Sequence, residues 1–138
     1  MKYTTIDSVL FIKNRQLFSE KILENSTSIF NSNDIMPTNA DGTMPFRQNN
    51  DLFWLCGIDQ EESVLVVSPQ HPNPLMREVL FLKETNEHIA IWEGPKLTKE
   101  HASNNSGIKT IFWLSELDET LNRIIAQTEN IYLNKNMH

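Results

Sequence analysis

The N-terminal part of the chain shows apolar residues at helical spacing. Five apolar positions fall close to one stripe of a helix: Leu10, Phe11, Leu17, Phe18 and Ile22. Spacings of three, four and seven residues place side chains on one helix face. The charged residues of the segment are expected to lie largely off that stripe: Lys13, Arg15, Glu20 and Lys21. The pattern predicts a helix over residues 7–24, capped by Asp7 or Ser8.

Continuous apolar runs mark the middle of the chain. Residues 64–67 read V-L-V-V and residues 78–82 read E-V-L-F-L. Such runs are typical of strands that are buried on both faces of a sheet. Pro72 and Pro74 lie between them and exclude regular strand pairing there. The two runs are therefore predicted to form a hairpin with a loop of several residues.

The remaining segments complete an alternation of helices and strands. Short strands are expected at 27–30, 109–113 and 129–133, helices at 51–56, 98–102 and 115–127, and a loop at 31–42. Gly57 is expected to end the second helix. In the last helix, Ser115 and Asp118 have capping-box spacing. Residues 86–94 suit a strand or a helical turn equally. Strands alternating with helices predict an α/β fold with a mixed sheet flanked by helices.

Size and charge narrow the class of protein. A chain of 138 residues is the length of one domain, so residues 1–138 are expected to form a single domain. The net charge is −6 and no Lys or Arg run is present, which makes nucleic acid an unfavourable partner. No apolar run approaches the roughly 20 residues of a membrane span. One cysteine and the lack of a signal-peptide pattern favour a cytoplasmic protein.

Most residues capable of chemistry lack the spacing that chemistry requires. No two of the four histidines are three or four positions apart, so a helical metal site is not indicated: His71, His88, His101 and His138. They are interpreted as solvated side chains. Cys56 stands between apolar neighbours and is interpreted as a buried, inert thiol. No nucleophile elbow, phosphate loop or dinucleotide fingerprint occurs.

Two features are left as candidate functional sites. Arg47, Asn49 and Asp51 belong to a polar cluster between apolar groups. An Arg–Asp salt bridge that fixes a loop is one interpretation, and contact between Arg47 and a partner domain or a substrate carboxylate is the other. Trp92 precedes Glu93 and a turn. Packing in the core and contact at an interface suit this Trp equally well.

The order of these segments resembles a known family. Residues 46–58 read F-R-Q-N-N-D-L-F-W-L-C-G-I, and residues 91–97 read I-W-E-G-P-K-L. Together with the strands between them, they resemble the N-terminal domain of aminopeptidase P, the X-prolyl aminopeptidase of the creatinase/prolidase group. The resemblance covers about residues 11–133. It implies a mixed sheet of ribonuclease-H-like topology.

The resemblance also implies that this chain does not itself carry the catalytic residues. In the family, a following "pita-bread" domain binds two divalent metal ions, usually manganese, through two Asp, one His and two Glu. Metal-activated water there attacks the bond between the first residue and a following proline. No residue of this chain is assigned as a metal ligand or a catalytic group, because none matches those motifs. The expected partners are the chain's own C-terminal catalytic domain, a peptide with proline at its second position, and further copies in a homo-oligomer.

The resemblance assigns positions to the candidate residues. Trp92 matches the Trp near the substrate entrance, and Arg47, Asn49 and Asp51 match the loop before the apolar helix. The N-A-D-G-T-M-P segment at 39–45 departs from many relatives. Two hypotheses follow: a non-catalytic domain that supports subunit assembly and substrate access in an X-Pro aminopeptidase, or a binding scaffold in a non-enzymatic parent such as a histone-chaperone subunit.

Overall fold

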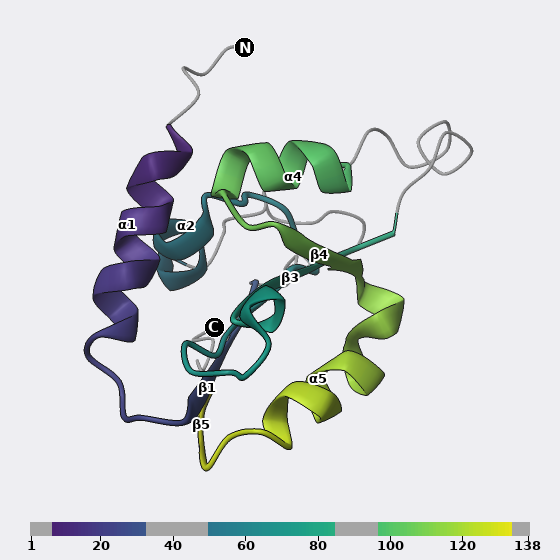
Figure 1. Cartoon of the computed structure of the whole chain (residues 1–138). Helices are drawn as coiled ribbons and strands as arrows, with labels where there is room; N and C mark the ends of the chain where they lie inside the picture. Colours follow the sequence, from purple (N-terminus) through teal and green to yellow (C-terminus); the bar gives the residue numbers. More distant parts are fainter. Residues whose placement is uncertain (1–6, 33–49, 85–96, 134–138) are drawn as a thin grey trace, which may run out of the picture.

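A mixed five-stranded sheet forms the centre of the protein (Figure 1). The computed structural model describes residues 7–32, 50–84 and 97–133. The strands are β1 (Ser26–Asn31), β2 (Val64–Val67), β3 (Glu78–Leu82), β4 (Thr110–Trp113) and β5 (Asn130–Leu133). The helices are α1 (Ser8–Ser19), α2 (Asn50–Cys56), α4 (Lys99–Ser106) and α5 (Leu117–Ile125), with short 3₁₀ turns η1 (Pro74–Met76) and η2 (Leu114–Glu116).

Strand order and direction follow from the connections. The order is β4-β3-β2-β1-β5. β2 is antiparallel to both neighbours, whereas β4 is parallel to β3 and β5 is parallel to β1. Parallel neighbours need a crossover connection. The link from β4 to β5 must cross the whole sheet, because these strands are its two edges, and α5 lies on that link.

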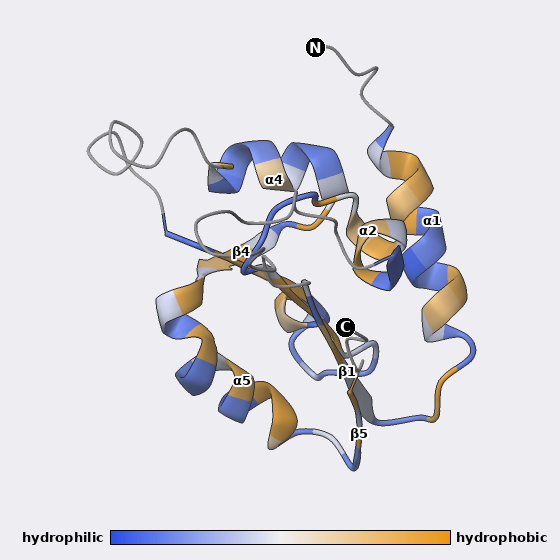
Figure 2. Ribbon diagram, turned by 180° about the vertical axis from the view of Figure 1, so that it is seen from behind, coloured by the Kyte–Doolittle hydropathy of each residue, from blue (hydrophilic) through white to orange (hydrophobic). Residues whose placement is uncertain are grey.

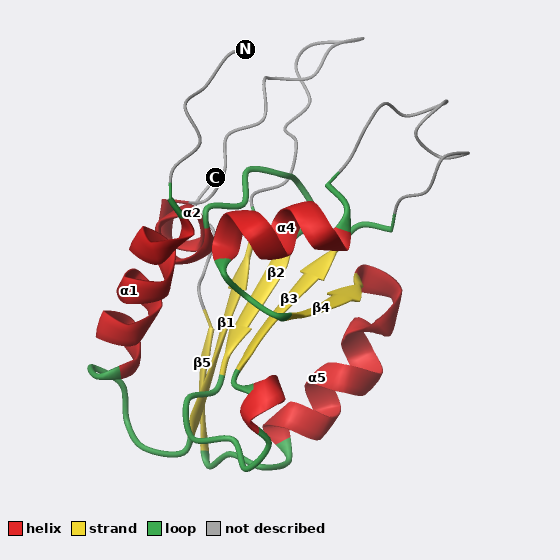
Figure 3. Ribbon diagram, turned by 45° about the horizontal axis from the view of Figure 1, so that its top comes forward, coloured by secondary structure: helices red, strands yellow, loops and turns green. Residues whose placement is uncertain are grey.

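The helices cover the two sides of the sheet unequally (Figure 3). We call the side covered by α1, α2 and α4 the three-helix face, and the opposite side the α5 face. On the three-helix face, Phe30, Leu65 and Leu80 are paired in register and pack with Leu52 and Leu55 of α2. The alternate strand residues point to the α5 face and pack with α5: Ile29, Val64, Val66, Val79 and Phe81. Both sides of the central strands are therefore buried.

The predicted fold class is confirmed, and so are the main strands. The runs 64–67 and 78–82 are strands with the predicted bounds and form an antiparallel hairpin. The predicted strand at 109–113 begins one residue later, at Thr110. α2 ends where the sequence predicts, at Gly57, whose φ of 70° is in the left-handed region that glycine tolerates.

Three predicted helix boundaries are wrong. α1 starts at the predicted cap, where Asp7 accepts a hydrogen bond from the Val9 N–H, but it ends at Ser19 instead of extending to residue 24. α4 continues through the predicted turn at 104–107 because Gly107 caps it in a left-handed conformation. The last helix spans 117–125 instead of the predicted 115–127, and its capping box lies earlier: the Glu116 carboxylate accepts from the Trp113 N–H at 2.9 Å.

The helices differ in how completely their apolar side chains are buried. Figure 2 shows α5 with distinct hydrophobic and hydrophilic sides, as its sequence predicts. α1 is different, because several apolar side chains remain exposed on it: Val9, Leu10, Ile12 and Leu17. β5 is an edge strand, and its last three side chains are also exposed: Ile131, Tyr132 and Leu133. These positions leave apolar surface at one edge of the domain.

Candidate functional site

Of the four predicted site residues, only Asp51 lies within the described part of the chain. It is exposed in the first turn of α2. A carboxylate there interacts favourably with the positive end of the helix dipole. Arg47, Asn49 and Trp92 lie outside the described residues. The predicted role of this cluster therefore stays a prediction.

Helix α2 is held firmly against α1. The Asn14 amide donates to the Trp54 carbonyl at 2.8 Å. The rings of Phe11 and Phe53 meet edge to face, with centroids 5.9 Å apart. The close approach requires Gly57: a Cβ at that position would come within 2.4 Å of the Phe11 ring. The segment that carries Asp51 is thus rigidly placed relative to α1.

Arg15 is a buried residue that joins three elements on the three-helix face. Its side chain is fully buried, and Nη1 donates to the Leu55 carbonyl at 2.8 Å. Nε lies 3.0 Å from the Glu78 carboxylate at the start of β3. Leu55 is in the last turn of α2, where carbonyls lack helical partners and a cation is favourable. Arg15 therefore ties α1 to both α2 and the sheet.

The prediction that Arg15 lies off the apolar stripe is wrong. At 100° per residue, position 15 falls about 40° from Phe11 and about 60° from Phe18, so it belongs to the same helix face. Leu10 and Leu17 lie about 100° or more from that centre and are exposed by 47% and 41%. Helical spacing alone therefore indicates this face for Arg15, although a charged side chain is rarely fully buried.

Cys56 is buried, as predicted. Its thiol is fully buried and donates to the Leu52 carbonyl at 3.2 Å. Burial raises the pKa of Cys56 from 9.0 to about 12. A hydrogen bond from the Ile58 backbone and the charge of Arg15 lower the pKa but do not offset burial. The thiolate that nucleophilic chemistry needs is therefore disfavoured at neutral pH.

His71 is buried, so its interpretation as a solvated histidine is wrong. Only 8% of the residue is exposed. Its Nδ1 accepts from the Asn73 N–H at 3.0 Å, and its carbonyl accepts from Arg77 Nε at 2.9 Å. His71 lies in the loop of the β2–β3 hairpin and lines a pocket beside α5, and the local sequence does not indicate its burial. His101 is exposed as expected, and the other two histidines lie outside the described residues.

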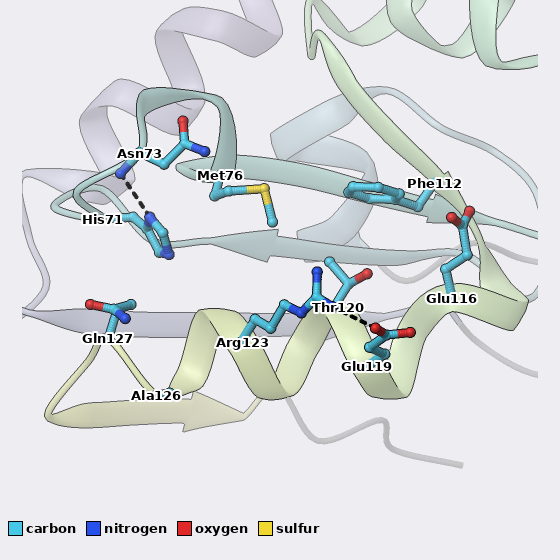
Figure 4. A pocket seen from close by; sticks show the side chains of 10 residues that line it. All are labelled: His71, Asn73, Met76, Phe112, Glu116, Glu119, Thr120, Arg123, Ala126 and Gln127. Atoms are coloured by element: carbon cyan, nitrogen blue, oxygen red, sulfur yellow. Dashed lines mark hydrogen bonds and ion pairs between the residues drawn. The ribbon is translucent and has the colours of Figure 1, made fainter.

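A cavity of about 760 Å³ lies between the hairpin loop and α5 on the α5 face (Figure 4). It is lined by His71, Asn73, Met76, Phe112, Glu116, Glu119, Thr120, Arg123, Ala126 and Gln127. We call it the α5 groove. Sequence reasoning missed it because its walls come from two distant segments, residues 71–76 and 112–127.

The described residues do not fit a metal centre. Across 7–32, 50–84 and 97–133, no three His, Cys, Asp or Glu side chains gather closely enough to bind a metal ion. In the same ranges, no helix is long and apolar enough to cross a membrane.

Comparison with known proteins decides the family. The sequence model described as "Aminopeptidase P, N-terminal domain" matches residues 11–132. The chain belongs to this family. The resemblance noted for residues 46–58 and 91–97 is thereby confirmed.

The curated relatives of this aminopeptidase P N-terminal domain are Xaa-Pro aminopeptidases. The chain is 27% identical over 113 residues to Xaa-Pro aminopeptidase 3 of Homo sapiens, covering 80% of this chain and 21% of that protein. It is 25% identical over 122 residues to the Xaa-Pro aminopeptidase of Escherichia coli K12, covering 88% of this chain and 27% of the relative. The chain thus spans about a quarter of the length of these relatives.

Solved aminopeptidase structures share the fold. Pseudomonas aeruginosa aminopeptidase PepP superposes with a TM-score of 0.86 at 20% identity, covering 99% of this chain and 30% of that one. E. coli aminopeptidase P with the inhibitor Pro-Leu superposes with a TM-score of 0.82 at 23% identity. This match covers 98% of this chain and 30% of the E. coli chain. The described residues therefore have the aminopeptidase P N-terminal domain fold, with its mixed sheet and flanking helices.

Proposed function

We propose that this chain is the non-catalytic N-terminal domain of a manganese-dependent X-Pro aminopeptidase. The observation that carries the proposal is the family match over residues 11–132, in a chain that spans 21–27% of its curated relatives. Residues 1–138 form one domain in this proposal. The parent removes an N-terminal residue that precedes proline, in the cytoplasm, and its separate catalytic domain binds two divalent metal ions.

The buried groups of the domain suit a structural role. Cys56 is held protonated by burial. Nδ1 of His71 is engaged by the Asn73 N–H. Arg15 is used to join α1, α2 and β3. A rigid body of this kind is suited to positioning an adjoining catalytic domain.

The proposed functional residues are those that precede and begin α2, together with Trp92. In this proposal, Arg47, Asn49 and Asp51 contact the catalytic domain or a neighbouring subunit, and Trp92 lines the substrate entrance. Support comes from Asp51, which is exposed at the start of a helix that Phe11 and Asn14 hold rigidly. The domain thereby supports subunit assembly and limits which peptides reach the metal ions.

The direct test is an assay of the purified chain on an X-Pro-Pro peptide with manganese. No release of the first residue is expected. Turnover that a chelator abolishes would contradict the non-catalytic role.

A second assay tests the supporting role. The polypeptide that follows residue 138 in the parent is produced separately and mixed with the chain. We expect X-Pro hydrolysis to rise on mixing, and to rise less with Trp92→Ala. Leu75→Ala is the control, because Leu75 is exposed in η1 and outside the proposed site. A following polypeptide without ligands for two metals would instead favour a scaffold.

A further inference from the structure

Two residues of β5 direct their backbone hydrogen-bonding groups at the open edge of the sheet. The Asn130 N–H donates to the Asn25 carbonyl at 3.2 Å, just before β1, so it points toward β1. Successive strand residues point their backbone groups to opposite edges. Tyr132 therefore also faces β1, its parallel neighbour, whereas Ile131 and Leu133 face outward. Among the strands that the structure describes, none lies beyond β5. Outward groups of this kind are a template for another strand.

The side chains of the same strand offer apolar surface on both faces. Ile131 and Leu133 are in register with Thr27 and Ile29, on the α5 face, and are exposed by 48% and 68%. Figure 3 shows α5 beside β4, at the other end of the sheet. Tyr132 is on the three-helix face and is 38% exposed. β5 contains neither a charged residue nor a proline, which commonly prevent pairing at an edge.

The opposite edge of the sheet, β4, is protected. Its four side chains are only partly exposed. The Trp113 N–H already donates to the Glu116 carboxylate at 2.9 Å. The Lys99 ammonium lies 4.9 Å from the centre of the Trp113 ring, so a charge stands beside the strand. The edge suited to accept another strand is therefore β5.

β5 is complementary to a second copy of itself. When two copies lie antiparallel with Tyr132 opposite Tyr132, Ile131 of each copy is opposite Leu133 of the other. The backbone groups of these two residues face outward, so each such pair exchanges two hydrogen bonds. Opposite side chains share a face, so Ile131 meets Leu133 on the α5 face and the two Tyr132 rings meet on the three-helix face. A two-fold axis relates the copies, which closes the assembly at two.

From these observations we infer that two copies of this chain pair through β5, antiparallel and centred on Tyr132, and so join their five-stranded sheets into one. The strands are short and cover less than the roughly 1,200 Å² of a stable interface, so the dimer is weak and forms at about 0.1–1 mM. The inference does not depend on the proposed function, because it concerns this chain alone and needs no catalytic domain.

Cysteine cross-linking tests the register, because the native Cys56 is buried and reacts slowly. In Tyr132→Cys, the two introduced residues are opposite each other with a Cα distance of about 4.5 Å, which a disulfide spans. In Ile131→Cys, the two are offset by two residues along the strand, so their Cα atoms are roughly 8 Å apart and beyond that reach. At roughly 0.5 mM under mild oxidation, we expect Tyr132→Cys to form disulfide dimers at least roughly tenfold faster. Leu75→Cys, exposed in η1, is the control for random collision.

A mixture of two variants tests the outer positions of the same register. Ile131→Cys and Leu133→Cys are opposite each other in the dimer, at a Cα distance of about 5.5 Å. Their mixed disulfide should therefore form faster than the disulfide of either variant alone. Cross-linking of Tyr132→Cys that is no faster than that of Ile131→Cys or Leu75→Cys overturns the inference.

Two substitutions at Leu133 separate the backbone contact from the side-chain contact. Leu133→Ala keeps the outward N–H, whereas Leu133→Pro removes it without breaking a bond to β1. In sedimentation equilibrium up to about 1 mM, we expect Leu133→Pro to dimerise at least roughly fivefold more weakly than Leu133→Ala. Their melting temperatures at about 10 µM, where the dimer is dissociated, should be similar. Equal dimerisation by the two variants, or a strict monomer of the unsubstituted chain at about 1 mM, overturns the inference.

Discussion

The guanidinium of Arg15 lies 3.0 Å from the carboxylate of Glu78 and joins the middle of α1 to the first residue of β3. The pair is asymmetric, because the Arg15 side chain is fully buried whereas that of Glu78 is 36% exposed. Removing Arg15 should therefore destabilise the fold by a different amount than removing Glu78.

We predict that Arg15→Ala lowers the free energy of unfolding by about 3 kcal/mol, because it removes a buried ion pair and leaves a cavity. Glu78→Gln should cost less, about 1–2 kcal/mol, because Glu78 is the partly exposed partner and a Gln carbonyl oxygen can still face the Arg15 guanidinium. Urea unfolding measures both. Lys13→Ala, at an exposed position of α1, is the control and should stay within about 0.5 kcal/mol. Equal effects at all three positions would contradict the role of Arg15.

Gly57 and Gly107 should differ in their response to alanine. Both have positive φ, 70° and 78°, so each substitution should cost about 1 kcal/mol from backbone conformation. At Gly57 the new Cβ also meets the Phe11 ring at 2.4 Å, and the ring is fixed by Phe53. At Gly107 the new Cβ meets the end of the Ile12 side chain at 2.6 Å.

Gly57→Ala is therefore expected to be the more destabilising, by roughly 1–2 kcal/mol, in urea unfolding. In the double variant Gly107→Ala/Ile12→Ala, the destabilisation caused by the contact between the new Cβ and Ile12 should disappear. A double-mutant cycle of the unfolding free energies measures this contribution. Additive effects in that cycle would show that the contact with Ile12 does not contribute.

The thiol of Cys56 should make stability depend on alkaline pH. Its pKa rises from 9.0 to about 12 in the folded protein through burial. The folded state therefore retains a proton that the unfolded state loses, and this contribution is present below pH 9 and lost as the pH rises toward 12. Over this pH window, the melting temperature of the unsubstituted chain should fall more steeply than that of Cys56→Val.

The same burial should protect Cys56 from reagents. At pH 8, a disulfide reagent such as DTNB should react only as fast as the protein opens, and at the normal rate for a free thiol in urea. Fast reaction of the folded chain would contradict the buried position.

The exposed edge strand predicts self-association. Ile131, Tyr132 and Leu133 are exposed by 48%, 38% and 68% on β5, at an open edge of the sheet. Such edges are prone to pair with other chains. Sedimentation velocity should show mass that rises with concentration, and Leu133→Lys should reduce it. Val9→Lys, at an exposed apolar position on α1, is the control. A strict monomer at high concentration would contradict the prediction.

Local patterns predicted the elements whose signal does not depend on distant contacts. The run V-L-V-V is the same strand in sequence and structure, because it is apolar on both sides. Gly57 ends α2 because only glycine adopts its φ without strain. The helix predicted at 98–102 extends to Ser106 because its C-cap is Gly107, and the Asn and Ser residues before this glycine suit a turn as well as a helix end.

The candidate site was less predictable. The cluster around Arg47 and Asn49 was identified from its motif and rests on the resemblance, with Asp51 placed by the structure at the start of α2. The α5 groove was not predicted, since His71 and Arg123 have no pattern in common along the chain. Spatial proximity of this kind arises only when the hairpin and α5 pack on the same face.

The sequence by itself determined the spacing of apolar residues in each helix and strand, the family and the class of fold. These properties depend on residue spacing and on backbone preferences, which act within a few positions of the chain. Tertiary structure alone decided that Arg15 pairs with the Leu55 carbonyl and the Glu78 carboxylate, and that His71 is buried beside α5. Burial depends on surfaces supplied by distant segments, so a charge or an imidazole is placed by its packing partners and not by its neighbours in sequence.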